Sequence, residues 1–140
     1  MIMRTRAAFW IAATALLLCL LTACGMINPK DSLNGSAWIL SYIDHTPPLD
    51  GRLLTVKFAE GQISGSSGCN SYSGPYEVNG EKISNGPIAV TMMACAEPGM
   101  MEQERIFLGY LQNAKSFKLS EGQLQIFRTD GKVLTFIPQG

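Results

Sequence analysis

The residues of this chain that could take part in chemistry are four cysteines, one histidine, several methionines and a few acidic side chains. Cys69 and Cys95 lie in two segments, 65–76 and 91–95, of which the first is rich in glycine and serine. They lack the C-x-x-C spacing of a redox-active pair. The other two cysteines fall within the first 24 residues, which have the layout of a secretion signal. We therefore expect Cys69 and Cys95 to form a structural disulfide.

The sequence offers little support for catalysis. His45 is the only histidine, and a Ser-His-Asp hydrolase would need it. It stands beside Pro47 and Pro48 in a segment with the composition of an exposed loop. The sequence has no G-x-S-x-G nucleophile elbow, no H-x-x-H metal pair and no Walker motif. We expect a protein that is not an enzyme, with no catalytic residue, no metal and no cofactor.

Five residues are candidates for a ligand-binding or partner-binding surface: Asn70, Tyr72, Met92, Met93 and Glu104. Each has a structural alternative. The asparagine can satisfy backbone groups of a turn, the tyrosine can pack in the core, and the glutamate can accept hydrogen bonds near a helix start. The structural alternative is favoured for all three.

Methionines flank Cys95 on both sides, at positions 92, 93, 100 and 101. Thioether sulfur suits Cu(I), which makes copper handling one hypothesis. Methionine is also an adaptable filler of hydrophobic cores. Packing is the favoured interpretation, because Met100 lies on the apolar face of a predicted helix.

The N-terminus has the layout of a bacterial lipoprotein signal. Arg4 and Arg6 precede an uncharged apolar run, 7–21, that is short for a membrane-spanning helix. Leu-Thr-Ala-Cys then ends at Cys24 and resembles the lipobox, whose cysteine carries lipid. We predict a signal peptide over 1–23 and a lipid anchor on Cys24. An uncleaved signal anchor is the alternative.

The residue after the lipobox cysteine is Gly25 rather than aspartate. The sorting rule for such lipoproteins then favours the outer membrane, facing the periplasm. Export would place Cys69 and Cys95 in an oxidising compartment, where disulfides persist.

Length and charge limit the rest of the chain. It has 140 residues, with 11 basic and 11 acidic side chains, so it lacks the basic footprint of a nucleic-acid-binding protein. We expect a flexible tether over 24–32 and one domain over 33–140. We also expect a monomer. Its predicted partners are the membrane, through Cys24, and an unidentified periplasmic protein or small ligand.

Short alternating segments predict a mainly β domain of about eight short strands with one helix. Strands are expected near 36–43, 54–59, 62–65, 76–78, 82–84, 88–92, 117–119, 124–127 and 133–137. Asn79-Gly80 is a strong hairpin signal. The predicted helix begins near Pro98 and places Met100, Phe107, Leu111 and Ala114 on one face. Antiparallel pairing into a small barrel-like fold is the economical topology.

Two segments, Gly-Cys-Asn-Ser-Tyr-Ser-Gly at 68–74 and Thr-Met-Met-Ala-Cys at 91–95, resemble the signature segments of the META/HslJ-like family. Met-Glu-Gln-Glu at 101–104 is also similar to that family, and the resemblance covers about 32–138. One departure is Met92, where the family often has a basic residue. The resemblance implies a compact antiparallel barrel-like fold in bacterial envelope proteins, with a role in heat shock, envelope stress or antibiotic tolerance.

These observations predict a non-enzymatic outer-membrane lipoprotein with a periplasmic domain that acts in envelope maintenance or stress tolerance. Two alternatives remain. One is a binding module that inhibits a periplasmic enzyme such as a lysozyme or a protease, with the loop 44–51 as its candidate contact. The other is Cu(I) binding through the methionines.

Overall fold

The computed structural model describes Lys30–Gly140. The predicted signal peptide (1–23), Cys24 and most of the tether (24–32) lie outside the described residues. The described part contains nine strands and the helix α2 (Met100–Gln112). The strands are β1 (Ser36–Ile43), β2 (Thr55–Ala59), β3 (Gln62–Ser66), β4 (Ser71–Asn79), β5 (Lys82–Asn85), β6 (Ala89–Val90), β7 (Ala114–Ser120), β8 (Gln123–Arg128) and β9 (Val133–Pro138).

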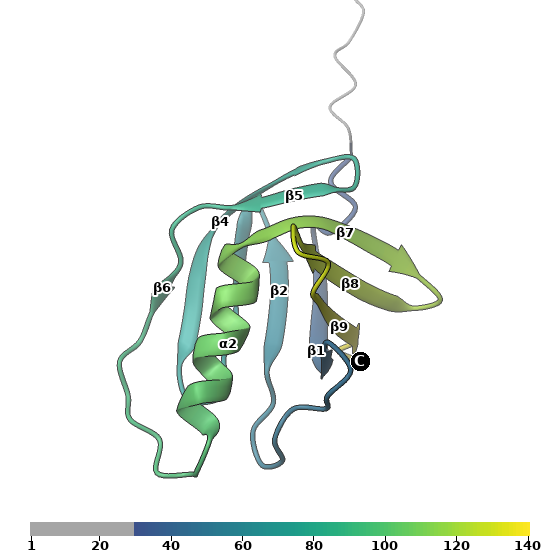
Figure 1. Cartoon of the computed structure of the whole chain (residues 1–140). Coiled ribbons are helices and arrows are strands. Elements are labelled where there is room, and N and C mark those ends of the chain that lie inside the picture. The colour runs from purple at the N-terminus through teal and green to yellow at the C-terminus, as the bar shows by residue number, and fades with distance from the viewer. Residues whose placement is uncertain (1–29) are drawn as a thin grey trace, which may run out of the picture. The chain divides into compact units, whose positions relative to one another are not determined.

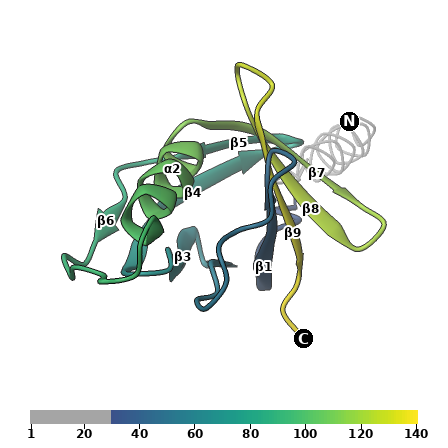
Figure 2. The ribbon, with the colours of Figure 1, turned by 60° about the horizontal axis from the view of Figure 1, so that its bottom comes forward.

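Eight of these strands form a closed antiparallel barrel. Their order is β3-β2-β1-β9-β8-β7-β5-β4, and pairing of β3 with β4 closes the ring. The two-residue strand β6 adds to the outer side of β4. Helix α2 leads into β7 and lies along the barrel beside β4 (Figures 1 and 2). The predicted fold, a mainly β barrel of about eight strands with one helix, is confirmed.

The core fills the barrel with side chains from alternate strand positions and from α2. Phe107 of the helix meets Tyr72 of β4 and Phe136 of β9 edge to face, with ring centroids 5.8 and 6.4 Å apart. Such aromatic pairs contribute about 0.5–1.5 kcal/mol beyond their area burial. The helix is thereby fixed to two strands on different parts of the barrel.

The glycine- and serine-rich segment is more regular than its composition suggests. Gly65 belongs to strand β3, which continues to Ser66, and β4 begins at Ser71. A Cβ built on Gly65 would lie 2.1 Å from the carbonyl oxygen of Thr55, so only glycine lets these two backbones approach. Pairing with neighbouring strands orders residues that are flexible on their own.

Both predicted ends of the helix are wrong. The helix begins at Met100 behind Gly99, which has a φ of 79°, so Pro98 precedes the helix. It ends at Gln112 and is capped by Asn113, whose side-chain amide donates to the Gly109 carbonyl at 2.8 Å. Ala114 is therefore the first residue of β7, paired with Arg128 of β8, and is not on the helix.

The strand expected at 88–92 is only Ala89–Val90. Beyond it, Met93 makes its backbone hydrogen bond with the Asn70 side chain instead of with a strand. Between residues 30 and 140, no helix combines the length and the hydrophobicity that crossing a bilayer requires.

Candidate functional site

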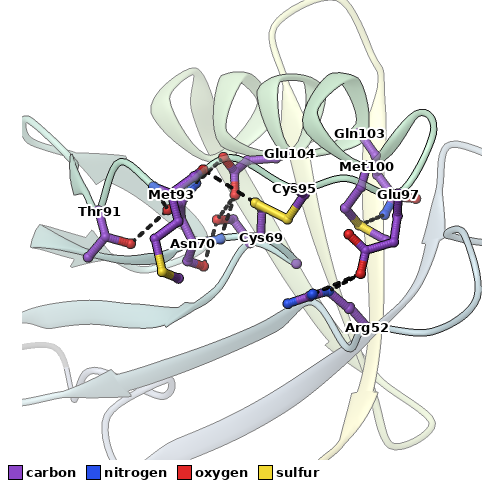
Figure 3. Close-up of a disulfide and its surroundings, with 12 residues drawn as sticks. Arg52, Cys69, Asn70, Thr91, Met93, Cys95, Glu97, Met100, Gln103 and Glu104 are labelled. Atoms are coloured by element: carbon purple, nitrogen blue, oxygen red, sulfur yellow. Dashed lines mark hydrogen bonds and ion pairs between the residues drawn. A yellow bond between two sulfur atoms is a disulfide. The ribbon is translucent and has the colours of Figure 1, made fainter.

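The disulfide predicted from the sequence is present. Cys69 and Cys95 are bonded, with their Cα atoms 5.7 Å apart (Figure 3). The bond joins the turn before β4 to the loop before α2. It thus ties together the two segments that carry most of the candidate residues.

Beside the disulfide, the buried carboxylate of Glu104 accepts three hydrogen bonds. Ser67 Oγ donates to Oε2 at 2.6 Å. The Asn70 backbone N–H donates to Oε2 at 2.9 Å, and Asn70 Nδ2 donates to Oε1 at 2.8 Å (Figure 3). The glutamate, placed on the apolar face of α2, is 7% exposed. Ser67 Oγ also lies 2.9 Å from the Asn70 carbonyl oxygen, so its single hydrogen is shared between that oxygen and the carboxylate. The carboxylate therefore holds the turn before β4 against the helix.

Asn70 continues this network to the loop beyond β6. Its Oδ1 accepts from the Met93 backbone N–H at 2.7 Å and from Thr91 Oγ1 at 2.9 Å (Figure 3). Both ends of the side-chain amide are thus used within the protein. Asn70 thus satisfies backbone groups of a turn, and Glu104 accepts hydrogen bonds near the helix start. We call Ser67, Asn70, Thr91 and Glu104 the carboxylate network.

Tyr72 also packs in the core. Its hydroxyl donates to the Thr55 carbonyl at 2.8 Å, and burial raises its pKa far above the ordinary tyrosine value. It is 3% exposed and does not reach the surface.

The methionines separate into two groups. Met100 is buried, with its sulfur 3.7 Å from Gln103 Nε2. Met92, Met93 and Met101 are exposed and line a shallow hollow of about 350 Å³ together with Asn70 and Glu104. Four of the five candidate residues thus border one hollow, and Tyr72 lies apart.

A second site lies where sequence reasoning did not place one. A cleft of about 620 Å³ opens between α2, the loop that joins β1 to β2, and the turn that joins β8 to β9. We call it the helix cleft. It is lined by Ile43, Asp44, Thr46, Pro47, Leu49, Gly99, Glu102, Gln103, Arg105, Ile106, Gly109, Tyr110, Arg128 and Lys132. Only the loop 44–51 had been considered from the sequence, as a partner contact.

At one wall of the helix cleft, Asp44 has a left-handed backbone with a φ of 55°. Its carboxylate accepts from Tyr110 Oη at 2.6 Å and from the Val133 backbone N–H at 2.9 Å. Burial acts to raise the pKa of Asp44, but these hydrogen bonds, together with the nearby charges of Lys132 and His45, outweigh it and lower the pKa below the ordinary value. Burial, and then the hydrogen bond to Asp44, raise the pKa of Tyr110 to about 12.

The cations of the helix cleft differ in how they are engaged. Arg105 pairs with Glu102 at 2.5 Å. Arg128 lies over the Tyr110 ring, 5.0 Å from its centroid, and one of its nitrogens pairs with Asp130 at 3.1 Å. Lys132 lines the cleft and forms no ion pair with any residue of 30–140.

Over the described range 30–140, no three histidine, cysteine, aspartate or glutamate side chains cluster as a metal site would require. His45 is exposed, as expected, and does not line the helix cleft.

Comparisons with known proteins agree with this fold. The family model described as META domain matches residues 31–140. A structure determined by NMR has a TM-score of 0.63 at 26% identity, with 76% of this chain and 91% of that chain covered. An NMR structure of a protein from Burkholderia xenovorans has a TM-score of 0.63 at 28% identity and covers 76% of this chain and 83% of its own.

A crystal structure of a DUF4847 family protein from Bacteroides vulgatus shares the fold, with a TM-score of 0.54 at 13% identity over 79% of this chain and 99% of that one. A search of curated proteins gave no match.

Proposed function

The chain belongs to the META domain family, and from that premise we propose that it is a non-enzymatic lipoprotein of the bacterial envelope whose domain binds a ligand or partner in the helix cleft. The observation that carries the binding role is the cleft itself. Its volume of about 620 Å³ falls in the range of small-molecule sites, roughly 300–1,000 Å³. It combines apolar walls with a few charged groups, as such sites do.

A non-catalytic role is supported by the way the polar groups are used. The carboxylate network has its donors and acceptors matched to one another within the protein. In the helix cleft, the Asp44 carboxylate is held by Tyr110 and Val133. These groups position loops. Ser67 Oγ meets the Glu104 carboxylate, but Ser67 is fully buried, so its hydroxyl is closed to a substrate.

We propose that the protein is located at the outer membrane, facing the periplasm, with lipid on Cys24. The lipobox supports it, and so does the Cys69–Cys95 bond, because disulfides persist in oxidising compartments. The test is the Cys24→Ser variant. It should leave the membrane fraction, and globomycin should block processing of the unaltered chain. A Cys24→Ser protein still in the membrane fraction would count against this location.

The envelope role we propose is maintenance or tolerance of stress, including heat and antibiotics, as the family resemblance implies. A strain lacking the protein should be more sensitive to these stresses than its parent. The unaltered chain should restore tolerance, and a variant with a filled helix cleft should not.

The binding role is tested with variants of Gly109, which lines the helix cleft. A Cβ at this position would meet no atom within 4 Å, so side chains fit there without disturbing the core. Gly109→Ala adds one methyl group and Gly109→Leu fills the space. Immobilised domain should retain the same envelope components with alanine and lose them with leucine, as read by mass spectrometry of proteins and small molecules. Equal retention by both variants would refute the cleft as the binding site.

Inhibition of a periplasmic enzyme is a second candidate, favoured by the loop at the rim of the helix cleft. Leu49 and Leu53 are 46% and 63% exposed on this segment. Exposed leucines in a loop suit insertion into another protein's pocket. The Leu53→Ser variant, which lies outside the cleft lining, should then lose a retained enzyme. Failure of the domain to retain any lysozyme or protease from envelope extract would remove this candidate.

A further inference from the structure

We propose that the ligand of the helix cleft is an amphiphilic anion, with an apolar aromatic or acyl body and a single carboxylate, sulfonate or phosphate head. This inference rests on the proposed binding function and adds the chemical class of the ligand. It follows from which hydrogen-bonding groups in the cleft are already used and which are free.

The acceptors of the cleft are largely used. Asp44 receives two hydrogen bonds from the protein, and Glu102 receives two from Arg105, at 2.5 and 2.9 Å. Gln103 Oε1 accepts from the Leu49 backbone N–H at 2.6 Å. The charge of Glu102 is thus balanced by Arg105, and Asp44 is held by donors of the fold, so neither carboxylate is an unpartnered site for a cation.

The donors of the cleft are in surplus. A guanidinium carries five N–H donors and an ammonium three. Arg128 engages Asp130 through one nitrogen, and its flat face rests on Tyr110. Lys132 makes no ion pair within residues 30–140. These two cations flank the turn from β8 to β9, where they can hold one anionic head group.

The remaining walls are apolar. Ile43 and Ile106 line the cleft, and Pro47 and Leu49 line it from the loop. Gly109, in the last turn of α2, leaves room that a larger side chain would occupy. The cleft thus has an apolar part beside the two cations Arg128 and Lys132. This combination suits an amphiphile better than a purely polar anion.

The experiment uses residues 25–140, secreted so that the disulfide forms. This segment holds the whole described barrel, and the NMR structure cited above consists almost entirely of the matched domain. Two probes are titrated into the 15N-labelled protein. 8-Anilinonaphthalene-1-sulfonate carries an anionic head, and N-phenyl-1-naphthylamine has the same rings without it.

The sulfonate probe should shift the amide signals of Gly109, Arg128 and Lys132 and should bind roughly tenfold or more tightly than the neutral probe. Arg128→Gln/Lys132→Gln should remove that advantage. The matched control is Lys115→Gln/Lys118→Gln, which removes two exposed cations of β7 that do not line the helix cleft and should bind like the unaltered protein.

Two results would overturn the inference. Equal affinity for both probes, with no effect of Arg128→Gln/Lys132→Gln, would mean that charge does not select the ligand. If Gly109→Leu still abolished binding, the cleft would remain the binding site and only the ligand class would be wrong. Shifts confined to residues outside the cleft would also overturn it.

Amphiphilic anions can diffuse freely or belong to a bilayer, and competition against the sulfonate probe separates these sources. Displacement by monomeric dodecanoate alone would identify a free ligand. Displacement by phosphatidylglycerol vesicles, lost in Arg128→Gln/Lys132→Gln, would identify membrane lipid. Displacement by neither would contradict the inference.

Discussion

Replacement of Glu104 by glutamine should strongly destabilise the domain. The carboxylate is buried and receives donors from Ser67 Oγ, Asn70 N–H and Asn70 Nδ2. A glutamine amide must place its NH₂ group opposite one of the two Asn70 donors, whichever way it is turned. That contact becomes repulsive and leaves a buried donor without an acceptor, which costs about 1–3 kcal/mol.

The remaining hydrogen bonds of Glu104 also lose the assistance of a charge, and charged hydrogen bonds are roughly twice as strong as neutral ones. Together the effects predict a loss of about 3 kcal/mol in the free energy of unfolding. For a domain of about 100 residues this lowers Tm by roughly 10–15 °C. Circular dichroism melts and urea titrations under non-reducing conditions measure both quantities.

The matched control is Glu102→Gln on the same helix. Glu102 is exposed and pairs only with Arg105, and exposed ion pairs contribute little, so Tm should stay unchanged. A Glu104→Gln variant that loses less than about 1 kcal/mol would refute the structural role of the carboxylate network.

Three further predictions concern other parts of the domain. Replacing Cys69 and Cys95 by alanine should cost about 3.5 kcal/mol by the chain-entropy relation for a separation of 26 residues, measured by urea unfolding; an unchanged midpoint would contradict this. The folded state lowers the pKa of Asp44, so the ionised carboxylate adds to the free energy of unfolding. This contribution is complete above the ordinary aspartate pKa of about 3.9 and is lost as pH falls through the lowered pKa of the folded state. Asp44→Asn should therefore be less stable than the unaltered chain at pH 7, and the gap should close in melts below about pH 4. Gly109→Ala should raise stability by about 0.5–1 kcal/mol, because glycine is a poor residue for a helix interior and nothing contacts the added methyl group; a lower Tm would show that the space is not free.

The sequence allowed prediction of what depends on local pattern. Alternation identified β1 and β2, Asn79-Gly80 identified the turn from β4 to β5, and the cysteine inventory identified the disulfide. The sequence also indicated that Glu104 could accept hydrogen bonds near the start of the helix, and the structure supplies its donors. These features share one property: the residues that reveal them are close in sequence or few in number.

The helix cleft could not be predicted in the same way. Asp44, Tyr110 and Arg128 come from a loop, a helix and a strand, and they meet only because β1, β8 and β9 are neighbours in the closed barrel. None of the three belongs to a motif. Likewise, the sequence around Gly65 indicates only flexibility. The structure shows that a Cβ at this position would clash with the Thr55 carbonyl.

If the helix cleft is where this domain binds its ligand, filling the cleft should release that ligand. The most direct measurement is native mass spectrometry of the protein isolated from its own envelope, compared between the Gly109→Ala and Gly109→Leu variants. We expect a bound mass of an anionic amphiphile with alanine and its absence with leucine, both proteins being folded. The same bound mass in both variants would refute binding in the cleft.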